Sequence, residues 1–168
     1  MKKRVVAIFF VAVFGLLFQA TILARFDLFG LALKPDFLLL LTVTYGLLKG
    51  PWYGASMGLL LGLFGDLFIG GVMGLGALAK MGTGFLVGLF EKLIFKDNLL
   101  VPAVAAFLAS LIADGAFLLL RAALGWPAGS FFPLLARLIL FAFYNAILAP
   151  LVYRPFYRLE RQGDDVAA

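Results

Sequence analysis

The sequence contains no cysteine and no histidine, and only 14% of its 168 residues are charged. Without cysteine the chain forms no disulfide and has no thiol nucleophile. Without histidine it lacks the commonest general base and, together with the missing thiols, the usual ligands of zinc. We therefore predict no metal site and no cofactor.

Apolar residues take the place of the missing charges. They make up 64% of the chain, and the mean hydropathy is +1.09. Because a soluble domain has about 25% charged residues, this composition predicts a single domain built for a lipid bilayer. The net charge of +5 does not indicate nucleic-acid binding, because the basic residues form no single tract and lie mainly at the ends of apolar runs.

The apolar runs and the turn signals between them predict an all-α integral membrane protein with six transmembrane helices. The helices are expected at residues 5–24, 35–48, 52–69, 75–95, 99–120 and 131–153. The first follows a basic start that resembles a signal peptide, but its twenty uncharged residues match a span and no cleavage motif follows. We expect it to be retained in a transmembrane domain of residues 1–158, with residues 159–168 as a disordered cytoplasmic tail.

The segment 49–51, Lys-Gly-Pro, predicts a tight turn between two of these helices. One continuous helix from Pro35 to Ile69 would be about 50 Å long, too long for a hydrocarbon core of about 30 Å. Asp36, beside Pro35, suits the positive end of the helix dipole at the start of the second helix. That helix is short for a span, so we expect it to use flanking residues or to thin the bilayer.

The distribution of basic residues favours cytoplasmic placement of both termini. With six spans, nine lysines and arginines fall on the cytoplasmic side, three fall outside and two lie within helices, which accounts for all 14. The cytoplasmic set is Lys2, Lys3, Arg4, Lys49, Lys92, Lys96, Arg154, Arg158 and Arg161. This bias satisfies the positive-inside rule, whereas an odd number of spans would place the three C-terminal arginines outside.

Two of the predicted helices carry small residues at a spacing of four. The first has Gly54, Gly58 and Gly62, and the second has Gly76, Gly84 and Gly88 with Lys80 and Lys92 in the same register. Residues four apart share a helix face, and a glycine face lets two backbones approach closely in lipid. Glycine is frequent in membrane helices generally, but the regular spacing on both helices favours a packing face. The glycine face could pack against a helix of the same chain or of a partner. Because only a few residues join the two predicted helices, 52–69 and 75–95, we favour a contact within the chain.

Four ionisable residues lie inside the predicted spans: Asp66, Lys80, Asp114 and Arg137. Their distances from the outer loops place all four in the outer half of the bilayer. A charge at the bilayer centre costs at least about 2.5–3.5 kcal/mol, so such groups usually pair or line a hydrated cavity. Chain distance makes Asp66–Lys80 and Asp114–Arg137 the expected pairs, although the basic side chains also have room to extend outward to the headgroups. Pairing is favoured for the second pair, and both interpretations stay open for the first.

No catalytic constellation accompanies these charges. Asp66 and Asp114 superficially match an intramembrane aspartyl pair, but each has a basic neighbour that would hold it ionised, whereas an acid catalyst needs its proton. An ion carrier finds little support, because the chain shows no inverted repeat. Asn145, in the last predicted helix, is expected to make an interhelical hydrogen bond.

One set of residues resembles a known family. The set is Pro35-Asp36-Phe37-Leu38-Leu39, then Gly50, then Gly54, Gly58, Gly62 and Asp66, then Gly74 and Ala77-Leu78. In order and spacing it resembles the bacterial rod shape-determining protein MreD, and the chain length, basic start and six apolar segments agree. Gly76 departs from the family pattern, which has a larger and often polar residue there, so the contact at that turn is expected to differ.

The resemblance implies a non-enzymatic protein of the bacterial inner membrane. It implies MreC as the main partner, with MreB, RodA and a class B penicillin-binding protein in a larger complex for lateral wall synthesis. It also implies a fold similar to the substrate-binding S-components of energy-coupling-factor vitamin transporters. A small-molecule-binding transporter subunit is therefore the alternative function, although the paired-alanine motif of those subunits has only a weak match, at Ala20 and Ala24.

Overall fold

The computed structural model describes residues 35–69, 73–93, 98, 100–126 and 131–165. All the regular secondary structure in these residues is helical, as predicted for an all-α protein. The helices are α2 (Phe37–Lys49), α3 (Pro51–Ile69), α4 (Leu75–Leu89), α5 (Leu100–Ala123) and α6 (Phe131–Asp165). The helix predicted at 5–24 lies outside the described residues, so the number of six helices stays a prediction.

The tight turn between α2 and α3 is confirmed. Gly50 has a φ of 90°, a left-handed conformation that favours glycine. Its backbone N–H donates to the Gly46 carbonyl at 2.9 Å and so closes the end of α2. Pro51 then occupies the first position of α3, where its missing N–H costs nothing.

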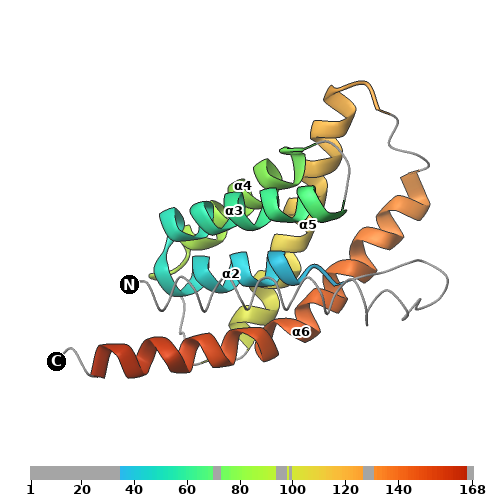
Figure 1. Ribbon diagram of the computed structural model, residues 1–168. Coiled ribbons are helices and arrows are strands. Elements are labelled where there is room, and N and C mark those ends of the chain that lie inside the picture. The colour runs from blue at the N-terminus through green and yellow to red at the C-terminus, as the bar shows by residue number, and fades with distance from the viewer. Residues whose placement is uncertain (1–34, 70–72, 94–97, 99, 127–130, 166–168) are drawn as a thin grey trace.

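Two helix ends differ from the prediction. Helix α4 ends at Leu89, short of residue 95, whereas α6 continues past residue 153 to Asp165. Helix α6 thus includes part of the segment for which the sequence predicted a tail, residues 159–168. Pro150 and Pro155 lie inside α6 and do not end it. A proline inside a helix removes one backbone hydrogen bond and produces a kink, and Figure 1 shows α6 changing direction between its orange and red parts.

Helix α2 forms the centre of the bundle. Every residue from Leu38 to Leu48 is buried. The helix contacts α3, α4, α5 and α6, and Figure 1 shows it between the α3–α4 pair and the red part of α6. A helix that is apolar on all sides is one that is buried on all sides. This explains why a segment too short for an ordinary span has a composition typical of one.

Helices α5 and α6 have the properties of membrane spans. The segments Leu100–Ala123 and Leu134–Arg161 are long and apolar enough to cross a bilayer, while α2 and α4 are shorter apolar helices. Only 22% and 17% of the residues in their most apolar windows are buried. Most of these apolar side chains therefore face outward, which suits contact with lipid and not the core of a soluble protein.

Glycines bring α3 and α4 into close contact. Methyl groups added at Gly54, Gly58 and Gly62 would collide with the backbone of α4 at Gly84, Lys80 and Ala77, respectively. At Gly58, for example, the added carbon would lie 2.6 Å from the Lys80 carbonyl carbon. The two helices run antiparallel with backbone against backbone. This contact fixes the position of Lys80 along the axis of α3, opposite Gly58.

Candidate functional site

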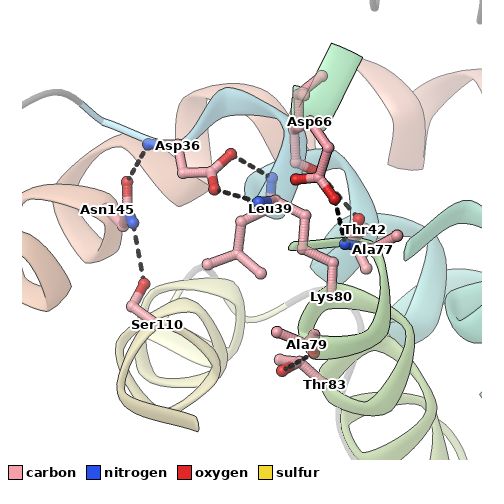
Figure 2. Close-up of polar contacts among 11 residues, drawn as sticks. Asp36, Leu39, Thr42, Asp66, Ala77, Ala79, Lys80, Thr83, Ser110 and Asn145 are labelled. Atoms are coloured by element: carbon pink, nitrogen blue, oxygen red, sulfur yellow. Dashed lines mark hydrogen bonds and ion pairs between the residues drawn. The ribbon is translucent and has the colours of Figure 1, made fainter. Parts of the chain in front are cut away.

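Asp36 and Lys80 form an ion pair between α2 and α4. The Lys80 Nζ lies 2.7 Å from Asp36 Oδ2, and both side chains are largely buried (16% and 21% exposed). Asp36 is also the N-cap of α2, because its Oδ1 accepts a hydrogen bond from the Leu39 N–H at 2.9 Å. One carboxylate thus stabilises a helix end and a buried cation, as Figure 2 shows.

Asn145 extends this network to α6 and α5. Its Oδ1 accepts a hydrogen bond from the Asp36 N–H at 3.1 Å, and its Nδ2 donates to Ser110 Oγ at 2.9 Å. Ser110 Oγ in turn donates to the Ala106 carbonyl at 2.7 Å. Asn145 and Ser110 are fully buried. The interhelical role predicted for Asn145 is confirmed, and Figure 2 shows the chain of contacts linking four helices.

Asp66 caps α4 from the end of α3. Its Oδ2 accepts hydrogen bonds from the Gly74 N–H at 2.8 Å and the Ala77 N–H at 3.2 Å. These are backbone donors at the positive end of α4, which have no partner within the helix. A side chain at Gly76 would collide with the Asp66 carboxylate. Glycine at this position therefore leaves room for the cap.

Of the two interpretations left open for Lys80, neither pairing with Asp66 nor extension to the headgroups is what the structure shows. Lys80 pairs with Asp36, although the charges of Asp66 and Asp114 also lie within electrostatic range of it. The helix hairpin brings Asp66 close to the start of α4, where backbone N–H groups satisfy its oxygens. The partner that binds Lys80 comes from α2, a helix earlier in the chain.

The structure does not join Asp114 to Arg137 in an ion pair. In the described part of the chain, no N–O contact within 4 Å links these two side chains. Asp114 is half-buried on α5, whereas Arg137 is exposed on α6. They interact electrostatically at longer range, and Asp114 also interacts electrostatically with Asp36 and Lys80.

These polar groups connect helices of the same chain and have a structural role. The carboxylates of Asp36 and Asp66 and the amide of Asn145 are engaged by protein groups from other helices or turns. The glycine face of α3 is filled by α4 and is not open to a partner. Gly84 also approaches α2, since a methyl group there would lie 2.7 Å from Thr42 Cγ2, and Gly88 lies against the backbone of Pro51.

Comparison with known proteins adds the identity of the chain. A family model for the rod shape-determining protein MreD matches residues 2–159. The chain belongs to the MreD family. Searches of curated proteins and of solved structures gave no match.

MreD membership agrees with the features described above. The match spans all five described helices except the last residues of α6. The family and the two long apolar helices indicate a membrane protein with a role in determining rod shape. The family is one of shape-determining structural proteins and is not known as an enzyme family. The similarity to S-components implied by the sequence has no support from solved structures.

Proposed function

We propose that this MreD-family protein is a non-enzymatic scaffold of the bacterial inner membrane that binds MreC. Through MreC it would connect cytoskeletal MreB to lateral peptidoglycan synthesis by RodA and a class B penicillin-binding protein. The observation that carries the proposal is the family match over residues 2–159. The internal use of the polar groups supports it, because a network that ties four helices together gives a rigid body for partners to bind.

The proposed arrangement in the membrane has six spans with both termini in the cytoplasm. The bias of basic residues toward the proposed cytoplasmic side supports it. Lys49, at the end of α2, makes an ion pair with Glu160 of α6, so the C-terminal part of α6 lies at the same end of the bundle as the α2–α3 turn. Asp36, Asp66 and Lys80 then lie toward the outer end.

We assign the MreC contact to an exposed apolar stripe on α6. The stripe consists of Leu140, Phe143 and Ile147, with exposed fractions from 41% to 70%. Spacings of three and four residues place these side chains on one helix face, which suits packing against a single partner helix. The glycine face of α3 is a poorer candidate because α4 already fills it.

Site-specific photocrosslinking tests this assignment. A photoreactive residue replacing Ile147 should crosslink to MreC in living cells, because that position is 70% exposed on the proposed face. The matched control is Leu60 on α3, which is 62% exposed on another helix. Crosslinking to MreC at Leu60 equal to or greater than at Ile147 would contradict the surface assignment.

A small-molecule-binding subunit remains the alternative function. A groove of about 440 Å³ between α4 and α5 is lined only by apolar side chains, among them Leu86, Val104 and Leu108. Such a groove offers no hydrogen bond to a water-soluble vitamin, since small-molecule sites orient their ligands through a few placed polar groups. A tightly retained small molecule after purification would support this alternative.

A further inference from the structure

We infer that the C-terminal part of α6, residues 151–161, binds the headgroups of anionic phospholipids. The binding surface is a basic face made by Arg154, Arg158 and Arg161, all of which are exposed. In a helix, residues four and seven positions apart lie on one side. The three guanidinium groups therefore form one stripe along the outside of the helix. This inference does not depend on MreC binding.

The fold fixes the direction in which this face points. On the opposite side of the helix, Tyr153 is 1% exposed and stacks on Tyr157 at a ring distance of 5.8 Å. Phe156 packs edge-on against Tyr45 of α2 at 5.6 Å, and Glu160 makes an ion pair with Lys49. The contacts of Phe156 and Glu160 with α2, together with the burial of Tyr153, hold the inner side of the helix against the bundle, so the arginines are directed outward.

Two of these arginines place positive charge at the surface. Glu160 is engaged by Lys49. Among the residues whose side chains the structure describes, which end at Arg161, neither Arg154 nor Arg158 has a carboxylate within 4 Å. A guanidinium group binds phosphate oxygens well because its donors form a planar fork.

Exposed leucines beside the arginines favour a lipid over a soluble acidic protein. Leu151 and Leu159 are 68% and 63% exposed, and they flank Pro155 at spacings of four on the neighbouring face. A helix with adjacent apolar and basic faces places the first among acyl chains and the second among headgroups. The kinked helix thus has the composition of a membrane-surface anchor with a preference for negative charge.

Native mass spectrometry of the full chain tests the inference. The solubilised protein is incubated with an equimolar mixture of phosphatidylglycerol and phosphatidylcholine, and the bound lipids are counted. Both lipids carry the phosphodiester, so a preference reports the net charge of the headgroup. The parent protein should favour phosphatidylglycerol, and Arg154→Gln with Arg158→Gln should lower that affinity by about fivefold for each arginine removed.

The matched control is the double substitution Arg154→Lys and Arg158→Lys, which keeps the charge and should retain most of the preference. An unchanged melting temperature in neutral detergent checks that each variant is folded. An equal preference in the glutamine variant, or no preference in the parent, would overturn the inference. Displacement of phosphatidylglycerol by inorganic phosphate at constant ionic strength would also overturn it, because it would indicate a site for free phosphate.

Discussion

Asp36 carries two interactions that are usually made by separate residues. It caps α2 through the Leu39 N–H and pairs with Lys80 of α4. The partial positive charge of the α2 N-terminus and the ammonium group of Lys80 both attract the carboxylate at this place. Lys80 gains in return a partner inside the bundle, which offsets much of the cost of a charge in lipid. A double-mutant cycle distinguishes this pair from the one expected from chain distance.

Asp36→Ala and Lys80→Ala should each destabilise the solubilised protein, because each leaves the other charge buried and unpaired. The double variant should recover about 0.5–3 kcal/mol of the summed loss, the range for residues in direct contact. The cycle of Asp66→Ala with Lys80→Ala serves as the control and should be nearly additive, because Asp66 binds backbone N–H groups. Strong coupling in the Asp66 cycle and none in the Asp36 cycle would contradict the pairing.

The difference between expected and observed pairing has a physical origin. Distance along the chain identifies neighbours within a hairpin, and it therefore suggested Lys80 as the partner of Asp66. It carries no information on how α2 packs against α4, which depends on the whole bundle. The cap role of Asp36 was readable from its position before an apolar helix. Asn145 was identified as an interhelical donor or acceptor, but its partners, Ser110 and the Asp36 N–H, were not.

A second prediction at the residue scale concerns the cap of α4. Gly76→Ser should displace the Asp66 carboxylate, because the new Cβ would occupy its position. Loss of a cap typically costs about 0.5–2 kcal/mol, so the melting temperature should fall. Asp66→Asn is the companion variant, since its amide oxygen still accepts the Gly74 N–H, and it should cost less. A Gly76→Ser protein as stable as the parent would show that the cap contributes little.

At the scale of elements, α3 and α4 behave as one unit held by backbone contact. The glycine periodicity was sufficient to predict this contact because only the smallest residue permits such an approach in lipid. The end of α6 could not be predicted in the same way. Pro150 and Pro155 are ordinarily read as stop signals, yet tertiary contacts of Tyr153 and Phe156 keep the helix intact beyond them. Local sequence therefore did not locate the end of α6.

Gly58→Ala and Gly82→Ala separate packing from helix propensity. Both glycines lie inside a helix, where alanine is intrinsically more stable by about 1 kcal/mol. At Gly82 nothing lies within 4 Å of the added carbon, so this variant should be neutral or more stable. At Gly58 the added carbon meets the Lys80 backbone, and overpacking of this kind costs about 1–3 kcal/mol. Thermal unfolding in detergent should therefore give shifts of opposite sign. Two shifts of the same sign would argue against the close contact.

At the scale of the whole molecule, the orientation of the bundle follows from the distribution of charge. The natural absence of cysteine makes single-cysteine labelling direct. Leu124→Cys, near the end of α5, should react with a membrane-impermeant thiol reagent added to intact cells, because that end is proposed to lie outside. Lys92→Cys should react only after the cells are permeabilised. Both native side chains are exposed, so burial would not explain a difference. Labelling of Lys92→Cys in intact cells with protection of Leu124→Cys would invert the proposed orientation.

The function of the buried polar groups also has to be judged from their partners across the whole bundle. A bundle whose buried charges and amides bind one another resembles a scaffold more than a receptor, and the MreD family match agrees with that interpretation. The most direct test is purification of the full chain in mild detergent from cells that also produce MreC, followed by mass spectrometry for bound proteins and small molecules. The scaffold account predicts that MreC is recovered with the protein and that no small molecule is retained. Recovery of a tightly bound vitamin-like molecule, with MreC absent, would contradict it.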